Sequence, residues 1–331
     1  MFGIVVSFIF CTLANATVLM SGSSRVYPFA IVMAEEFAFK TKLHPPIVES
    51  VGTGGGFSVF CNGNHPNSPD IINASRKIKD SEKKECAKNG VEYQSVTIGL
   101  DAIVIAMHTN NKATINSLTD DELFKALARN IVSNGKIIPN PYQKWSDINP
   151  NLPNSDIIIY GPPSTSGTRD TFTKIVLATP CMKNKYFRLQ YKKQLKSICS
   201  LMRNDGKFIE TGENDAFIMH KISLRNGAVG IFGYSHYMEN KHNINAIQIN
   251  GVSINQQTIA TSQYKIARPL FLYFKKHSLA IKPDVRLFYK EATSSEAIGV
   301  GGYLESYHLI PLDKEFLLNH QIKETDTIKN A

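Results

Sequence analysis

The sequence has few of the features that mark a metalloprotein, a nucleic-acid-binding protein or an integral membrane protein. Its 331 residues include only five cysteines, with no Cys-x-x-Cys pair and no histidines at metal-ligand spacing. After the N-terminus, no apolar run is long enough to span a bilayer. The basic residues look scattered, and no nucleic-acid-binding module accompanies them. We therefore expect a globular protein with no metal, no cofactor and no nucleic-acid partner.

The signatures of common hydrolases are also missing. An α/β-hydrolase places its nucleophile in Gly-x-Ser-x-Gly. The segment around Ser166 lacks the leading glycine of this motif, and residues 233–237 lack the trailing one. A metal-independent hydrolase would still need an activated nucleophile beside a base, and no such pattern is present. We therefore expect a protein that is not an enzyme.

The N-terminus reads as a targeting segment. Residues 2–13 are apolar but too short to cross a membrane, and Ala14-Asn15-Ala16 fits a small-x-small cleavage site. A positive n-region is lacking. We predict that residues 1–16 are a signal peptide cleaved after Ala16, and that the mature protein is exported to the periplasm.

Four cysteines remain after this expected cleavage. An even number of cysteines in an exported chain favours disulfides. Closeness along the sequence favours the pairs Cys61–Cys86 and Cys181–Cys199. A metal site is the weaker alternative, because the spacing of the sulfur and histidine ligands does not fit one.

Apolar runs of strand length alternate with helical patterns along a chain that is long enough for two domains. Residues 27–40 are typical of a helix, with Pro28 near the start and Phe29, Val32 and Phe37 at helical spacing. Residues 157–160 form a short apolar run, and residues 169–177 again look helical. This alternation predicts an α/β fold with mostly parallel strands.

Four segments share one form, in which a predicted strand ends and a turn rich in Ser, Thr or Gly follows. They are Gly22-Ser23-Ser24, Gly52-Thr53-Gly54, Ala74-Ser75-Arg76 and Ser166-Gly167-Thr168. Where a helix follows the turn, its first N–H groups are unpaired and its dipole favours an anion. Ligands of α/β sheets collect beyond the carboxyl ends of strands. The sequence therefore predicts a metal-free oxyanion site built from several such turns.

At these residues the chain resembles the phosphate-binding protein of the high-affinity phosphate ABC transporter. The resemblance covers nearly the whole mature chain, and its motifs are specific through their order and spacing. They are residues 22–24 with Tyr27-Pro28, residues 52–57, 73–76, Asp101, residues 166–170, Gly233-Tyr234 and residues 264–270. It implies a two-lobed periplasmic binding protein, type II-like, with a two-segment hinge near Gly99 and residues 232–234. Lobe 1 would hold residues 17–98 and 236–331, and lobe 2 would hold residues 99–235.

The resemblance also implies which residues hold the ligand. Ser24 and the backbone N–H of Arg25 belong to the first loop, Thr53 to the second, and Ser75 with Arg76 to the third. The fourth loop supplies Ser166, Gly167 and Thr168. Each carries donors that suit an oxyanion, and arginine can hold two oxygens at once.

Two positions depart from the pattern of the family. Arg25 stands where many relatives have a hydroxyl residue, which leaves the role of its side chain open. Pro162 and Pro163 occupy the region where some relatives place an arginine, so Arg76 is expected to face the ligand. Relatives with Asp in place of Arg76 use that carboxylate to accept the phosphate proton, so here Asp101 or Asp170 would have to do so.

These residues imply an exported, monomeric protein that captures inorganic phosphate in the cleft and delivers it to an ABC permease. A carboxylate that accepts a proton favours phosphate and repels sulfate, which has no proton to give. The same scaffold binding sulfate or molybdate is the first alternative. A phosphate-ester hydrolase is the second and weaker one.

Overall fold

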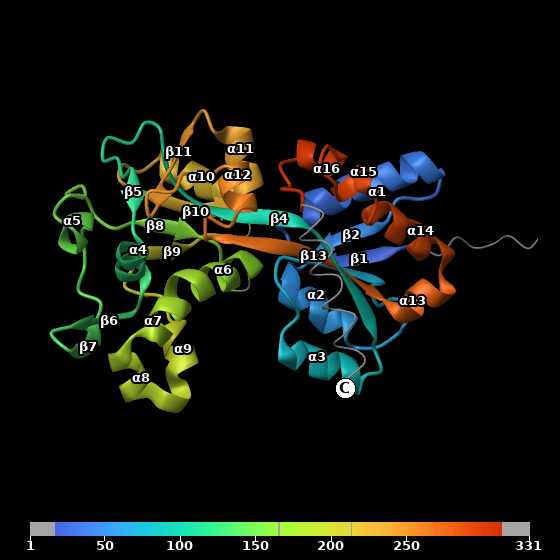
Figure 1. Ribbon diagram of the computed structural model, residues 1–331, viewed down its shortest axis with the longest axis horizontal. Helices are drawn as coiled ribbons and strands as arrows, with labels where there is room; N and C mark the ends of the chain where they lie inside the picture. Colours follow the sequence, from blue (N-terminus) through green and yellow to red (C-terminus); the bar gives the residue numbers. More distant parts are fainter. Residues whose placement is uncertain (1–16, 165, 213, 313–331) are drawn as a thin grey trace, which may run out of the picture.

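The computed structural model describes residues 17–164, 166–212 and 214–312, so the expected signal peptide of residues 1–16 lies outside the described residues. Figure 1 shows two halves in which helices surround a sheet, joined by two long strands that cross the middle of the molecule. These strands are β4 (Tyr93–His108) and β13 (Ala267–Lys275). The mixture of helices and strands confirms the α/β class.

Within the described residues, nine strands form one hydrogen-bonded sheet in the order β2-β1-β3-β13-β4-β10-β8-β9, and β11 also pairs with β4. The pairs of β1 with β2 and β3, and of β8 with β9 and β10, are parallel. Because β13 and β10 run antiparallel to β4, the sheet is mixed and not mostly parallel as predicted. The other strands of this sheet are β1 (Leu19–Gly22), β2 (Ile47–Ser50), β3 (Ile71–Ala74), β8 (Ile159–Gly161), β9 (Phe208–Glu210), β10 (Val229–Gly233) and β11 (Ile244–Ala246).

The first half packs helices on both faces of its part of the sheet. Helix α1 buries Phe29, Val32 and Phe37 on one face, as their spacing predicts, in a core shared with α14. Phe57 and Phe60 of α2 pack on the other face with Tyr273 of β13. The helices of this half are α1 (Tyr27–Thr41), α2 (Gly52–Phe60), α3 (Asp80–Lys88), α13 (Lys276–Ile281), α14 (Pro283–Ala292), α15 (Ser295–Ile298) and α16 (Tyr303–Ser306).

The second half has its own apolar core around β4, β8 and β10, which includes the buried Trp145. Its helices are α4 (Asp120–Leu127), α5 (Trp145–Ile148), α6 (Gly167–Phe172), α7 (Thr179–Lys183), α8 (Lys185–Tyr191), α9 (Leu195–Cys199), α10 (Asp215–Ser223), α11 (Tyr234–Asn240) and α12 (Gln256–Ala260), with a π-helical segment η1 (Thr173–Ala178) and a 3-10 turn η2 (Lys192–Gln194). Two short pairs complete it: β12 (Gln248–Ile249) with β5 (Ser117–Leu118), and β6 (Asn130–Ser133) with β7 (Lys136–Pro139). Among the described residues, no helix combines the length and apolarity that crossing a bilayer requires.

Strand β4 belongs to both halves. Its residues up to Ala102 pair with β13, and its residues from Ile103 pair with β10. The register of β4 and β13 shifts beside Gly99, where Leu270 is opposite Gly99 and Phe271 is opposite Thr97. A bulge of this kind bends a strand locally, which fits the predicted hinge position near Gly99.

The division of the chain into lobes stays a prediction, and the packing favours a different second boundary. Ile244, Ile249 and Tyr264 contribute to the core of the second half, and β11 pairs with the end of β4. Residues 236–266 therefore pack with the second half, although the sequence assigned them to lobe 1. On this packing the second crossing is β13 instead of residues 232–234.

Both predicted disulfides are present. Cys61 bonds to Cys86 and links the end of α2 to α3, with the two Cα atoms 4.1 Å apart. Cys181 bonds to Cys199 and links α7 to α9, with the two Cα atoms 5.4 Å apart. The sequence separations are 25 and 18 residues, so each bond closes a local loop.

Replacing Cys181 and Cys199 together by serine is expected to lower the free energy of unfolding by about 3 kcal/mol, because the unfolded chain loses a loop constraint. Chemical denaturation followed by circular dichroism measures the change. The Cys61→Ser/Cys86→Ser variant is the matched comparison and should lose a similar amount. An unfolding free energy equal to that of the wild type would contradict the constraint.

Candidate anion-binding site

Three of the four predicted turns meet in one place. The Thr53 and Ser75 hydroxyl oxygens are 3.2 Å apart, and the Ser75 N–H donates to the Thr53 hydroxyl at 3.2 Å. A Cβ added to Gly167 would lie 2.2 Å from Ser75 Oγ and 3.0 Å from Thr53 Oγ1. Because such contacts are too short for a side chain, only glycine lets the turn from the second half approach this closely.

Helix α6 presents its N-terminus to this meeting point. Ser166 caps the helix by accepting a hydrogen bond from the Thr168 N–H at 3.2 Å. Ser166 and Thr168 are buried, as are Thr53 and Ser75 of the first half. The first turn of α6 and the hydroxyls of two other turns therefore share one desolvated region.

Arg268 of β13 connects α6 to strands β4 and β13 through its side-chain contacts. Its guanidinium donates to the Gly167 carbonyl at 2.9 Å and to the Thr168 hydroxyl at 2.8 Å. It also pairs with Asp101 at 3.2 Å, the residue directly opposite it on β4. Burial lowers the pKa of Arg268 to about 10, against the opposing effect of Asp101, so the guanidinium stays charged at neutral pH.

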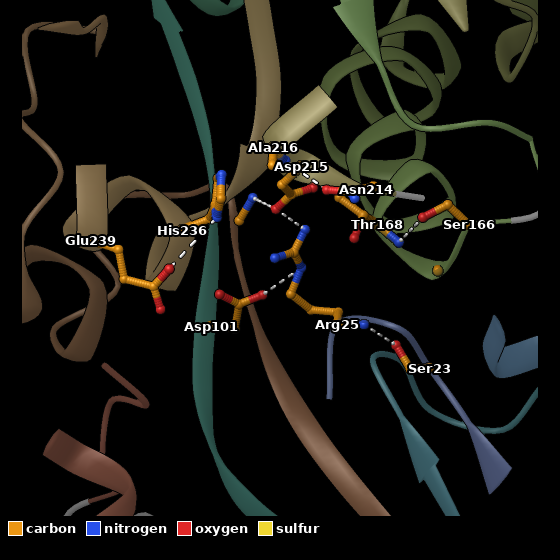
Figure 2. A network of polar contacts seen from close by, with 12 residues as sticks. Ser23, Arg25, Asp101, Ser166, Thr168, Asn214, Asp215, Ala216, His236 and Glu239 are labelled. Atoms are coloured by element: carbon orange, nitrogen blue, oxygen red, sulfur yellow. Dashed lines mark hydrogen bonds and ion pairs between the residues drawn. The ribbon is translucent and has the colours of Figure 1, made fainter. Parts of the chain in front are cut away.

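Arg25 joins the first loop to the second half. Figure 2 shows its guanidinium between Asp215 of α10 and Asp101 of β4. Asp215 also accepts the Gly233 N–H at 3.0 Å, and a Cβ on Gly233 would lie 2.2 Å from Arg25 Nη1. The Arg25 backbone N–H, predicted as a ligand donor, donates to the Ser23 hydroxyl at 3.2 Å.

Arg76 lies at the rim of this cluster. Its guanidinium donates to both carboxylate oxygens of Glu82 on α3, at 2.8 and 2.7 Å, and its Nε is 3.3 Å from Asp170 of α6. Lys79 also contacts Asp170 at 2.9 Å. The ligand-facing role of Arg76 stays a prediction, and Arg25 and Arg268 are further guanidiniums beside the same turns.

The remaining predicted residues differ in burial. Asp101 is 2% exposed at the centre of the cluster, whereas the Asp170 side chain is 37% exposed at the rim. Ser24 is half-buried in the loop between β1 and α1. The structure thus gathers Arg25, Thr53, Ser75 and Asp101 with the first turn of α6, and places Arg76 beside them.

The cluster balances its own charges. Two guanidiniums, of Arg25 and Arg268, face two carboxylates, of Asp101 and Asp215. The hydroxyls and the α6 N-terminus add donors without adding net charge. Among the described residues, no group of three or more His, Cys, Asp or Glu side chains could hold a metal ion. The arrangement suits a small oxyanion that is bound by hydrogen bonds and guanidiniums.

Two members of the cluster were not among the predicted site residues. Arg268 did carry a signal, because a charged side chain within the apolar run of residues 266–274 has to be buried and paired. Asp215 carried none, since Asn214-Asp215 also reads as an ordinary helix start, and Asn214 does cap α10.

Residues 12–296 match the model of a family described as the PBP superfamily domain. The chain belongs to this family. It is 32% identical over 280 residues to Protein SphX of Synechococcus elongatus, covering 83% of this chain and 72% of that protein. It is 28% identical over 312 residues to the phosphate-binding protein PstS of Staphylococcus saprophyticus, covering 93% and 84% of the two chains.

Solved structures agree with this membership. A protein of Planctomyces limnophilus described as a possible phosphate binding protein superposes with a TM-score of 0.60 at 26% identity, over 94% of this chain and 98% of the other. An ABC-type phosphate transport receptor of Vibrio cholerae superposes with a TM-score of 0.61 at 18% identity, over 88% and 99% of the two chains. The second likeness shows the shared two-lobed fold.

Replacing Arg268 by glutamine is expected to lower the free energy of unfolding by about 3 to 5 kcal/mol, because Asp101 is left as a buried charge without its cross-strand partner. Denaturant titration measures the loss. In an Asp101→Asn background the same replacement should lower the free energy of unfolding by clearly less, since no buried carboxylate then loses its partner. Equal losses in the two backgrounds would show that the pair is not coupled.

Proposed function

We propose that this protein is an exported solute-binding protein that captures inorganic phosphate between two lobes and delivers it to an ABC permease. Membership of the family supports a binding protein over an enzyme. The names of relatives, phosphate-binding protein PstS among them, support phosphate as the solute. We expect the mature protein to act as a monomer in the periplasm, after cleavage following Ala16.

The convergence of turns from both halves carries this proposal. Thr53 and Ser75 come from the first half, and the first turn of α6 comes from the second, yet Gly167 lies against both hydroxyls. A small anion held there would receive hydrogen bonds from hydroxyls, from the N–H groups of α6 and from guanidiniums. Such a ligand would stabilise the arrangement in which the two halves are together.

We propose β4 and β13 as the hinge that lets the lobes separate. They are the strands that cross between the two halves, and their register shifts near Gly99. Rotation about these strands would move α6 away from Thr53 and Ser75 and open the site to solvent. The permease would then distinguish the closed form from the open one.

Asp101 is the better of the two candidates for accepting the phosphate proton. It is buried at the centre of the cluster beside Arg25 and Arg268. Asp170 lies at the rim, where its side chain is 37% exposed. A buried carboxylate favours an anion that can donate a proton to it and disfavours one that cannot. This argues for phosphate against sulfate or molybdate.

Calorimetric titration of ligand-stripped protein tests the proposal, and Gly167→Ala tests the site. The wild type should bind phosphate and bind sulfate and molybdate far more weakly. The added methyl group of Gly167→Ala would push α6 away from Ser75 and Thr53, so phosphate affinity should fall at least about tenfold, or about 1.4 kcal/mol.

Gly212→Ala is the matched control, because a Cβ there would meet nothing within 4 Å and the residue lies outside the predicted turns. It should bind phosphate like the wild type. Tight binding of sulfate or molybdate with no binding of phosphate would overturn the choice of ligand. Steady release of phosphate from an ester substrate would favour the hydrolase alternative.

Asp101→Asn is expected to reduce the preference for phosphate over sulfate at least about tenfold, because an amide can donate to a sulfate oxygen and no longer repels it. Asp170→Asn is the paired variant and should keep the wild-type preference. Competition between the two anions, followed by calorimetry, gives the ratio. The reverse pattern would assign the proton acceptor to Asp170.

A further inference from the structure

One segment of this protein carries a high net positive charge because it lacks acidic residues. Residues 171–204 contain eight Lys or Arg and no Asp or Glu, in a chain whose net charge is +9. The prediction that the basic residues are scattered along the chain is therefore wrong for this segment. None of these basic residues belongs to the anion-binding site described above, so the charge calls for a separate explanation.

This segment forms a small helical unit with its own core. It runs through η1, α7, α8, η2 and α9, and Figure 1 shows α7, α8 and α9 grouped beyond α6, away from the sheet. Phe187 packs with the Cys181–Cys199 disulfide in a separate apolar cluster. Phe187 and Tyr191 also stack, with ring centroids 6.2 Å apart. The disulfide and this core hold the surface of the unit in a fixed shape.

The outer surface of the unit is basic. Six exposed side chains, which we call the basic face, are Lys183, Lys185, Arg188, Lys192, Lys193 and Lys196. Lys185 and Arg188 share one side of α8 by their helical spacing, away from the buried Phe187, and Lys192 follows directly at the end of the helix. Leu189 lies on that same side and is 71% exposed.

In the part of the chain that the structure describes, no acidic residue neutralises the basic face. Among the described residues, none of its six cations forms an ion pair. Lys125 on α4 of the same half does form one, with Asp121 at 2.7 Å. Unpaired like charges on one rigid surface repel one another, so a polyanionic partner would relieve this repulsion.

We propose that the basic face binds the surface of an anionic phospholipid bilayer. Juxtaposed lysines and arginines are attracted to anionic headgroups, and an exposed leucine among them can enter the interface. Single-stranded nucleic acid is the less suitable polyanion, because it needs free aromatic rings on which bases stack. Here Lys185 Nζ lies over the Tyr186 ring at 5.1 Å, and Tyr191 stacks on Phe187.

Such binding would hold the protein close to a membrane surface. The basic face lies on α7, α8, η2 and α9, outside the elements that supply Thr53, Ser75 and Arg268. Membrane binding and anion binding are therefore separable in this protein. The proposal does not depend on which anion the site prefers.

Co-sedimentation with vesicles tests the proposal on the mature chain. The protein should bind vesicles in which about one third of the lipid is phosphatidylglycerol, and should not bind pure phosphatidylcholine. Raising the salt from about 0.1 M to about 1 M shortens the Debye length from ~10 Å to ~3 Å and should release it. Lys185→Glu/Lys192→Glu should weaken binding at least about tenfold, and Leu189→Ser should weaken it further at constant charge.

Lys241→Glu/Lys290→Glu is the matched control, because it changes the net charge equally at two exposed positions outside the basic face. It should keep most of the vesicle binding. Equal losses in the two double variants would overturn the proposal, as would tighter binding to an oligonucleotide than to vesicles at equal phosphate. The Lys185→Glu/Lys192→Glu variant should titrate with phosphate like the wild type, so failure of one proposal is distinguishable from failure of the other.

Discussion

The cross-strand ion pair of Arg268 with Asp101 is the contact on which the arrangement of the site depends. The two residues are opposite each other on β13 and β4, the strands that cross between the halves. Arg268 also donates to the Gly167 carbonyl and to the Thr168 hydroxyl, so it fixes α6 relative to these strands. A buried guanidinium needs partners in all these directions, and this need couples the fold to the position of the anion-binding turn.

Around this pair, neutral donors and balanced charges make the region suitable for a small oxyanion. Arg25 and Asp215 add a second ion pair between the first loop and the second half, while Thr53 and Ser75 add hydroxyls. The hydroxyls come from turns that follow strands, where α/β folds collect ligands. The basic face lies in a separate helical unit with its own disulfide. The anion-binding site, in which positive and negative side chains pair, is therefore separate from the basic face, whose positive charges have no acidic partners among the described residues.

Much of the site was predictable because its parts are local. Ser166 caps α6 as its position before a helix indicates, and both disulfides join cysteines that are close in the sequence. Longer-range pairings were not predictable. Arg25 pairs with Asp215 across the two halves, and residues 236–266 pack with the second half. These outcomes depend on how α10 and β13 are placed in space.

The sequence by itself determined the alternation of helices and strands, the hydroxyl-rich turns and the local disulfide loops. Each of these features depends on residues that are close together along the chain. The tertiary structure decided which of these turns meet and which charges neutralise one another. Asp101 is far from Arg268 and Arg25 far from Asp215 along the chain, and only the sheet order and the crossing of β4 and β13 bring them together. Burial then turns these neighbours into obligatory pairs, because an unpaired charge in such a region is strongly disfavoured.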